Sequence, residues 1–564
     1  MNAALLFLWT AAVSPGDDVV RKAMSDEMAR TMKELQIPNE PRPHRVAYVV
    51  TDTEMMSGGA TFGASFGISS RRWRTLRVEV RVGDRNFDSG NFVDNFASDS
   101  TSMLPVEDDP LALRRELWLR TDDAFKRAVD AIGRKRAAEK AQAKSGEEAP
   151  FDFAESKPVE GARTGAGPEA LDPGALAKLA TALSAVFREY PGIHSSRAGG
   201  EHLIVRQRLL TSDGSWKDER RSYVELAASA ETQAEDGMRL RSWSTFQATD
   251  LAGLPPLADM TKTVRAMAAD LTAARKAAIG DNGTAVVLFE GWAAGQLLRR
   301  LLGDHLSGTP PPRSARGGMV PASDLASKLG QRIAPPFLEV HDDPREPLGP
   351  GKVPLFGSYQ IDDEGVPAER VSLVKNGMLE SLLMSRTPRK EITRSNGHGR
   401  GRSQAGAVRG RVGVLYVSAG KAALSDQALR ARAVKEAKAA GKEVPVYIVR
   451  HLDSTAPITG GEDGPRGAGV RPLIVVRLRD GKEEPVRGIT FQNLLPRSLK
   501  DLVAVAKQPI VYNYLTPQEG PITAGGAPGT IVTPSVLFKD IEVKKDTDKN
   551  PRPPLYPHPS FAEK

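Results

Sequence analysis

The alternation of apolar and polar residues predicts strands in the first half of the chain. The clearest case is the stretch 76–82, in which one leucine and three valines alternate with Arg77, Glu79 and Arg81. This period of two predicts a strand with one buried face and one solvated face. Five further apolar stretches have the length and residue types of strands, at 46–50, 60–68, 203–210, 222–228 and 238–246.

Helical periodicity appears between these strands. Asp17 and Asp18 can cap a helix that runs to about Leu35, with apolar side chains along one face. Three further helices are predicted, at 109–132, 176–187 and 260–278. Helices combined with meandering strands indicate an α+β N-terminal domain at residues 17–255. Within it, residues 142–169 are rich in Gly, Pro, Ala and Glu without periodicity, which predicts a mobile insertion.

The middle of the chain combines an apolar run with a helical pattern. Residues 285–289 are apolar and long enough for a buried strand, and leucines recur at helical spacing after Gly291. We treat 256–335 as a central helix–strand–helix region. A strand that leads directly into a helix can direct side chains into a cleft. The polar side chains of this helix are therefore candidates for chemistry, namely Arg299, Arg300, Asp304 and His305.

Strands dominate the second half of the chain. They are predicted at 412–417, 444–450, 473–478, 484–491, 510–514 and 531–541, with one charged helix at about 425–440. Many strands with few helices indicate a largely antiparallel C-terminal β domain at residues 336–545, followed by a proline-rich tail at 546–564. Asn376 and Gly377 lie between two apolar runs and predict a hairpin turn, because both residues tolerate a positive φ.

Composition limits the class of protein. A chain of 564 residues is too long for a single core. Charged residues at 26% and hydrophobic residues at 40% describe a soluble globular protein. The net charge of +8 is small for this length and does not by itself indicate nucleic-acid binding. The sequence has no cysteine, which excludes disulfides and thiolate chemistry.

The first residues form a short apolar run. Residues 1–13 contain an apolar run with the length of a signal-peptide core, although no Lys or Arg comes before that run. They are too short to span a bilayer. Residues 1–16 are therefore interpreted as a signal peptide or a mobile tail. A signal peptide implies an exported or periplasmic protein, and the alternative is a cytoplasmic one. No membrane span is predicted.

Three stretches carry a resemblance to a known family. From Gly291 to Gly308 the sequence follows the pattern GW-x-x-G-x-LL-x-x-x-x-G-x-x-L-x-G. This pattern resembles the zinc-helix segment of the TldD/PmbA (TldD/TldE) metalloprotease family. Residues 361–379 are similar to the family's DDEG-x-P segment with its following hairpin, and residues 395–400 resemble its glycine and asparagine turn near the cleft. The resemblance covers about residues 285–542.

The resemblance implies a zinc site, but the residues at the matching positions do not suit one. Arg299 falls on the first histidine of the family's His-Glu-x-x-x-His motif, Arg300 on the glutamate and Asp304 on the second histidine. Guanidinium groups are permanently charged, so they repel a cation and cannot accept a proton. The resemblance also implies a cysteine ligand, and the chain has no cysteine. We therefore expect no cofactor, although zinc is expected in the family.

These features predict a TldD/TldE-family homologue that is not itself catalytic. It is expected to bind a peptide or unfolded protein segment, or to act as a companion in a homo- or hetero-oligomer with a TldD-like subunit, without nucleic acid. Three adjacent acids at 362–364 either bind a cation or substrate amine, or cap backbone amides within a turn. The residues expected near the cleft are Glu290, His305, Asp362, Asp363, Glu364, Asn396 and His398.

Two alternative hypotheses stay open. The first is an active metallopeptidase with a relocated metal site that uses Glu290, Asp304, His305 or His398. It requires at least two histidines to converge on one point. The second is a basic envelope or nucleic-acid binding protein. It rests on scattered arginines alone and requires a contiguous basic face.

Overall fold

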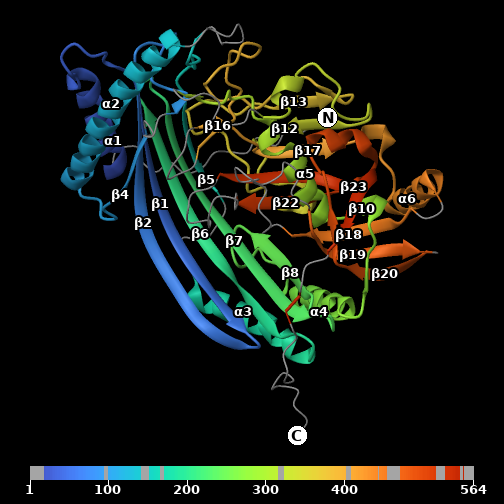
Figure 1. The fold of residues 1–564 in the computed structure, drawn as a ribbon. Helices are drawn as coiled ribbons and strands as arrows, with labels where there is room; N and C mark the ends of the chain where they lie inside the picture. Colours follow the sequence, from blue (N-terminus) through green and yellow to red (C-terminus); the bar gives the residue numbers. More distant parts are fainter. Residues whose placement is uncertain are drawn as a thin grey trace, which may run out of the picture.

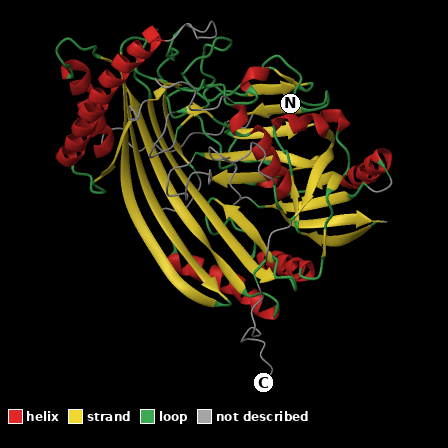
Figure 2. Ribbon diagram, viewed as in Figure 1, coloured by secondary structure: helices red, strands yellow, loops and turns green. Residues whose placement is uncertain are grey.

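Two large β-sheets organise the molecule, one built mainly by each half of the chain (Figure 1). A computed structural model describes residues 18–93, 99–141, 151–165, 171–314, 323–401, 408–441, 444–453, 470–479, 481–515, 527–546 and 550–551. Helices pack at both ends of the first sheet and against the second (Figure 2). The predicted α+β fold with a strand-rich C-terminal half is therefore confirmed.

The N-terminal sheet has seven strands in the order β4–β2–β1–β6–β7–β5, with β8 paired to β7. They are β1 (Pro43–Thr61), β2 (Ala64–Val82), β4 (Asp99–Leu104), β5 (Glu160–Thr164), β6 (Ser195–Thr211), β7 (Trp216–Gln233) and β8 (Arg239–Ala248). Neighbouring strands are antiparallel except β5 and β7. The four longest strands curve along their length, and their concave side faces the C-terminal half (Figure 1).

Four helices cover the convex face of this sheet, namely α1 (Val19–Glu34), α2 (Pro110–Ala141), α3 (Pro173–Ala185) and α4 (Leu257–Ala274). Side chains of α1 and α2 share a core with Tyr48, and side chains of α3 and α4 share a second core with Met56. Both residues are on β1 an even number of positions apart, so both cores lie on one face. The predicted cap is confirmed, because Asp18 accepts hydrogen bonds from the backbone N–H groups of Val20 and Arg21.

The concave face carries the charged residues of the alternating pattern. Arg77, Glu79 and Arg81 are at most 9% exposed. The prediction that this face is solvated was therefore wrong. The alternation identified the strand correctly, but the polar face is buried in ion pairs and covered by the C-terminal half rather than by water.

The C-terminal sheet has twelve strands in the order β14–β13–β12–β17–β23–β10–β18–β19–β20–β9, with β21 and β22 paired to β23. They are β9 (Ala278–Ile279), β10 (Gly283–Phe289), β12 (Glu339–Asp342), β13 (Val371–Lys375), β14 (Met378–Leu379), β17 (Val414–Ser418), β18 (Val446–Leu452), β19 (Pro472–Arg479), β20 (Lys482–Arg487), β21 (Ile489–Phe491), β22 (Leu502–Leu515) and β23 (Pro528–Lys545). Helix α5 (Trp292–Leu302) packs on one face and α6 (Asp426–Ala440) on the other.

Most neighbouring pairs in this sheet are antiparallel, and three pairs are parallel: β10 with β18, β17 with β23, and β9 with β20. The predicted hairpin is confirmed, since Asn376 (φ 50°) and Gly377 (φ 73°) join β13 to β14. The remaining short elements are β3 (Phe92–Val93), β11 (Arg313–Ser314), β15 (Gly399–Arg400), β16 (Arg409–Gly410), η1 (Val186–Glu189), η2 (Asp304–Leu306), η3 (Ala326–Lys328), η4 (Pro350–Lys352), η5 (Gly420–Ala422) and η6 (Pro496–Asp501).

Two predicted boundaries differ from the structure. The central region 256–335 divides between the halves, because α4 packs on the N-terminal sheet whereas β10 and α5 belong to the C-terminal core. Within the predicted insertion at 142–169, part of the segment 151–165 is packed: Phe153 is 1% exposed, and β5 pairs with β7. Three guanidinium groups cover the ring of Phe153. Apolar periodicity in the sequence does not predict this kind of packing, because the partners of the ring are charged.

No helix within the described ranges is long and apolar enough to cross a membrane. The predicted signal peptide or tail at residues 1–16 lies outside the described residues, as does most of the predicted tail at 546–564.

Candidate functional site

Helix α5 lies between the C-terminal core and a cleft. It follows β10 through Gly291, whose φ of 54° is in the region that favours glycine. Its leucine side chains are fully buried. Gln296 anchors the helix to β18, because its side chain accepts a hydrogen bond from the backbone N of Leu452 (2.9 Å) and donates one to the carbonyl of the same residue (3.1 Å). This packing leaves Arg299 lining the cleft.

Aromatic residues of β22 hold the side chain of Arg299. Its Cζ lies 4.2 Å from the ring centroid of Tyr514, and its guanidinium group donates a hydrogen bond to the Tyr512 hydroxyl. The two tyrosine rings stack at 5.9 Å, and Trp292 of α5 meets Tyr512 edge-on at 5.4 Å. Burial raises the pKa of Tyr512, and the Arg299 charge opposes that rise. The guanidinium is therefore fixed by cation–π and hydrogen-bond contacts.

The cleft between the two sheets has a volume of about 760 Å³. One wall is formed by α5 and β22, and the other by the concave face of β1, β2, β6, β7 and β8. The wall of α5 and β22 contributes Trp292, Gln296, Arg299, Tyr512, Asn513, Tyr514 and Leu515. A volume of this size is typical of sites that bind part of a peptide or a small molecule.

The sheet wall of the cleft has few bulky side chains at its centre. Gly59 of β1 pairs with Gly199 of β6, and Gly58 pairs with Gly200. A Cβ atom on Gly199 would lie 2.4 Å from the carbonyl oxygen of Gly58, so the strands approach too closely for any other residue. Glycine thus keeps the floor of the cleft flat and leaves room above it.

Two acidic side chains project from this floor. Glu201 on β6 and Glu225 on β7 are direct register partners. Gln247 of β8 donates a hydrogen bond from Nε2 to Oε2 of Glu225 (2.8 Å). Burial raises the pKa of both carboxyl groups, and the charge of Glu225 raises the pKa of Glu201 further. The sheet wall therefore carries these two acids together with Arg197 of β6, whereas the α5 wall carries the cation of Arg299.

Two tryptophans from opposite walls enclose a histidine beside the cleft. The ring of His451 stacks on Trp292 of α5 at 6.1 Å and meets the edge of Trp243 of β8 at 5.7 Å. Burial lowers the pKa of His451 to about 4, so its ring is neutral at pH 7. An ion pair between Arg241 of β8 and Asp453 joins the two walls at the same place.

Comparison with known proteins relates the C-terminal part of the chain to a family. Residues 282–545 match the family model of the PmbA/TldA metallopeptidase C-terminal domain. This part of the chain is similar to the TldD/PmbA family. The match begins just before β10 and ends with β23, so it covers the C-terminal sheet except β9, together with α5. The resemblance seen in the sequence is confirmed.

Solved structures share the fold over nearly the whole chain. TldE from Thermococcus kodakarensis has 15% sequence identity and a TM-score of 0.60, and the likeness covers 92% of this chain and 99% of that one. A Thermotoga maritima protein named as a modulator of a DNA gyrase has 14% identity and a TM-score of 0.61, covering 93% and 100%. At such identities the likeness is one of fold.

Shorter matches connect the chain to two proteins named metalloprotease. One, from Methanothermobacter thermautotrophicus, is 45% identical over 64 residues, which is 11% of this chain and 13% of that protein. The other, from Archaeoglobus fulgidus, is 35% identical over 71 residues, which is 13% and 15%. The chain thus matches only a small share of the length of these two relatives.

The TldD/PmbA motif positions beyond Arg299 have separate surroundings. Arg300 is half-buried, its Nε donates to the carbonyl of Leu494 (3.4 Å), and burial lowers its pKa. Asp304 belongs to η2, and its side chain lies outside what the structure describes. His305 follows it and is half-buried; its carbonyl accepts a hydrogen bond from Ser323. Arg300 and His305 are absent from the described lining of the cleft.

The other candidate acids also lie outside the described cleft lining. Glu290 forms an ion pair with Arg430 at 2.8 Å and lies 3.6 Å from Arg450. Asp362 accepts hydrogen bonds from three backbone N–H groups, those of Glu364, Val366 and Gly399. These bonds agree with the interpretation of the acidic segment as a turn whose carboxylates cap backbone amides.

The other two acids of this TldD/PmbA segment bind residues of both halves. Asp363 lies 3.0 Å from the Nζ atom of Lys217 on β7; burial alone would raise its pKa, but the charges of Lys217 and Arg400 lower it. Glu364 accepts a hydrogen bond from the backbone N of Arg386 (2.6 Å). Burial raises the pKa of Asp362 to about 6, and burial with neighbouring acidic charge raises that of Glu364 to about 7.

Asn396 and His398 are buried in the C-terminal half. The Asn396 side chain accepts from the backbone N of Met384 (2.8 Å) and donates to the carbonyl of Leu382 (2.8 Å). His398 contacts Asp342 through Nε2 (3.1 Å) and the carbonyl of Asn396 through Nδ1 (2.9 Å). Both ring nitrogens of His398 are thus engaged. No group of three His, Cys, Asp or Glu residues that could hold a metal gathers in the described part of the chain.

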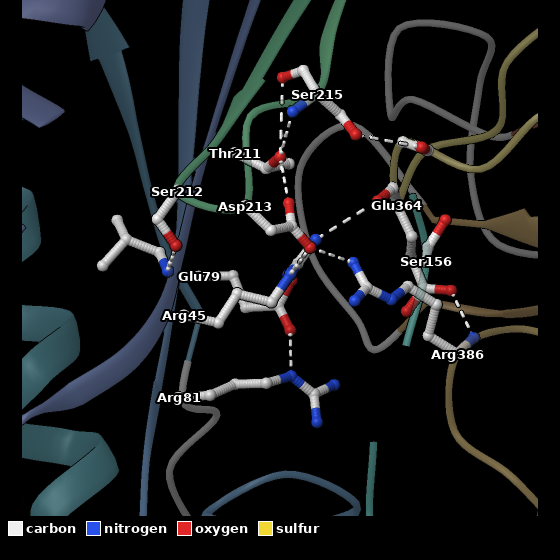
Figure 3. A network of polar contacts seen from close by, with 12 residues as sticks. Arg45, Glu79, Arg81, Ser156, Thr211, Ser212, Asp213, Ser215, Glu364 and Arg386 are labelled. Carbon is white, nitrogen blue, oxygen red and sulfur yellow. Dashed lines mark hydrogen bonds and ion pairs between the residues drawn. The ribbon is translucent and has the colours of Figure 1, made fainter. Parts of the chain in front are cut away.

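A buried network of ion pairs joins the two halves of the chain (Figure 3). Arg45 and Arg81 both bind Glu79, at 3.0 and 2.7 Å, and Arg386 of the C-terminal half binds Asp213 at 2.5 Å. Burial alone would raise the pKa of Glu79, but the two arginines hold it well below its usual range. No local sequence pattern predicts this network, because its members come from strands and loops far apart in the chain.

Proposed function

We propose that this protein is a non-catalytic member of the TldD/PmbA family that binds a peptide or unfolded protein segment in the cleft between its sheets. The observation that carries the proposal is the position of Arg299. The sequence pattern matches it to the first zinc-motif histidine of the family; it lines the cleft and is bound to Tyr512 and Tyr514. The cleft is present, while the residue expected to coordinate zinc is a cation.

The donor set supports a role without zinc. A catalytic zinc site uses neutral imidazole, thiolate or carboxylate ligands and one open position for water. Arg299 and Arg300 can neither donate a lone pair to a metal nor accept a proton. A flat glycine floor and an aromatic wall remain, and these suit an extended chain better than a bulky folded partner.

The test combines metal analysis with peptide binding. The full-length protein, purified without chelator, is analysed for bound metal and then mixed with a fluorescein-labelled unstructured peptide. We expect peptide binding, no cleavage and no stoichiometric zinc. One equivalent of zinc together with peptide cleavage would overturn the proposal and favour a relocated metal site. Binding should fall in the Tyr514→Ala variant, and the matched control is Tyr416→Ala, whose ring stacks on His341 outside the described cleft lining.

The likeness to TldE also supports a companion role in an oligomer with a TldD-like subunit. The test is co-expression with a TldD-family protein that carries the His-Glu-x-x-x-His motif, followed by size-exclusion chromatography with light scattering. Co-elution as one complex is the expected result. Separate elution of two species would overturn the companion role and leave peptide binding by the isolated chain as a separate question.

A further inference from the structure

We propose that the cleft selects peptide segments with a basic side chain, and that Glu201 and Glu225 bind its cation. The inference rests on the proposed function, since it names the class of peptide that the cleft accepts. Three observations carry it: acidic groups without a cationic partner, a floor that brings them together, and an aromatic wall opposite.

The acids of the cleft differ from three buried acids that lie where the two halves of the chain meet. Glu79 binds Arg45 and Arg81, Glu219 binds Arg221, and Asp363 binds Lys217. In contrast, Glu225 receives a hydrogen bond from Gln247 alone, and within the described residues no ion pair reaches Glu201 or Glu225. These three acids thus have cationic partners, whereas the two acids of the cleft have none among the described residues.

The fold places the two carboxyl groups side by side. Glu201 and Glu225 are register partners on adjacent antiparallel strands, and side chains at such positions have Cβ atoms about 4.5–5.5 Å apart. Like charges at this separation repel each other. A cation between them removes that repulsion and returns part of the solvation that burial removes. An ammonium or guanidinium group supplies enough donors to bind both.

The neighbouring cations do not fill this role. Arg299 is bound to Tyr512 and Tyr514 on the opposite wall. Arg197 lies on β6 four residues from Glu201, about 13 Å along the strand, and its guanidinium is over the ring of Phe66. These are the other charged residues that line the cleft. A bound cation therefore has its place at the two glutamates and is repelled from the Arg299 side.

The wall opposite the acids suits the apolar stem of a basic side chain. Trp292, Tyr512 and Tyr514 line it, and Trp243 lies on the sheet side. Because the Arg299 guanidinium already lies over Tyr514, the rings of this wall are suited to pack against methylene groups while the charged head stays at the glutamates. Acidic groups on one side and aromatic rings on the other recognise the charged head and the apolar stem of a Lys or Arg side chain together.

The experiment measures binding of labelled peptides by fluorescence polarisation at constant ionic strength. The probes are an unstructured peptide with one central lysine, the same peptide with glutamine or glutamate at that position, and an N-acetylated form of each. The proteins are the wild type, the Glu201→Gln/Glu225→Gln variant and the Glu235→Gln control. Glu235 is exposed in the turn between β7 and β8, so its change removes charge without altering the cleft.

The wild type and the control are expected to bind the lysine peptide at least about tenfold more tightly than the glutamine peptide, with the glutamate peptide weakest. The double variant should lose this preference while it retains its affinity for the glutamine peptide. Equal affinity of the wild type for all three peptides would overturn the inference but not the proposed function. Failure to bind any peptide would overturn both. A preference abolished by N-acetylation alone would assign the cation to the peptide amino terminus and overturn the assignment to a side chain.

Discussion

Glu364 is a buried carboxyl group whose proton affinity depends on the packing of the two halves. Burial and the charges of Asp362 and Glu79 raise its pKa from 4.5 to about 7. A carboxyl group with a higher pKa in the folded chain binds its proton more tightly when folded. It therefore stabilises the fold below pH 4.5, and this contribution is lost as the pH rises through about 7.

The Glu364→Gln variant keeps an oxygen that can accept the Arg386 hydrogen bond but does not ionise. We expect the wild type to lose stability relative to this variant when the pH is raised from 5 to 8. Urea unfolding at both pH values measures the difference, and Glu235→Gln is the exposed control. An unchanged difference between wild type and Glu364→Gln would contradict the prediction.

At the scale of elements, the contact between α5 and β22 fixes the cleft wall. A Cβ atom on Gly295 would lie 2.4 Å from the Cβ of Tyr512, so no side chain fits between helix and strand. Gly295→Ala should therefore lower the free energy of unfolding by about 1–3 kcal/mol. It should also weaken peptide binding, because α5 carries Arg299 and β22 carries its aromatic partners. Urea unfolding and fluorescence polarisation measure the two effects.

A second helical glycine gives the opposite prediction. Gly133 of α2 is exposed, and a Cβ atom there would meet no atom within 4 Å. Gly133→Ala should raise the free energy of unfolding by about 0.5–1 kcal/mol, since alanine favours the helix. Urea unfolding of Gly295→Ala and Gly133→Ala measures the two changes in the free energy of unfolding. Equal effects of the two substitutions would show that helix propensity, not the approach of Tyr512, determines the result.

Elements differ in how far the sequence predicts them. The hairpin at Asn376-Gly377 and the step from β10 into α5 follow from local patterns, and the structure contains both. Strand β1 is longer than the predicted 46–50, because polar residues and the glycines 58–59 interrupt its apolar pattern while pairing with β6 continues. Arg299 was found through a family pattern in one helix. Glu201 and Glu225 were missed, since only strand register places them together.

At the scale of the whole molecule, Phe153 lies where the halves meet. The Cζ atoms of Arg45, Arg81 and Arg386 lie 4.9, 4.2 and 4.2 Å from its ring centroid. Phe153→Ala should lower the free energy of unfolding by about 3–5 kcal/mol and leave three guanidinium groups without their aromatic contact. We expect the wild type to unfold in a single transition and the variant to unfold in two, because in the variant the halves lose their coupling.

The control for this prediction is Phe125→Ala. Phe125 is 1% exposed and belongs to the core that α2 shares with β1 and β2, rather than to the contact between the halves. It should lower stability by a similar amount without separating the transitions, as followed by calorimetry. Two transitions in both variants would contradict a specific role for Phe153. The sequence alone does not predict this contact between the halves, since an isolated aromatic residue in a Gly- and Pro-rich stretch has no apolar periodicity around it.

The order of strands in the C-terminal sheet affects how the chain folds. β23 follows every other described strand of that sheet, yet it pairs with β10, β17, β21 and β22. The strands before it therefore stay incompletely paired until the last described strand has left the ribosome, whereas the strands of the N-terminal sheet can pair during synthesis. Slow translation near β23 would prolong the time in which unpaired edges are open to chaperones or to aggregation.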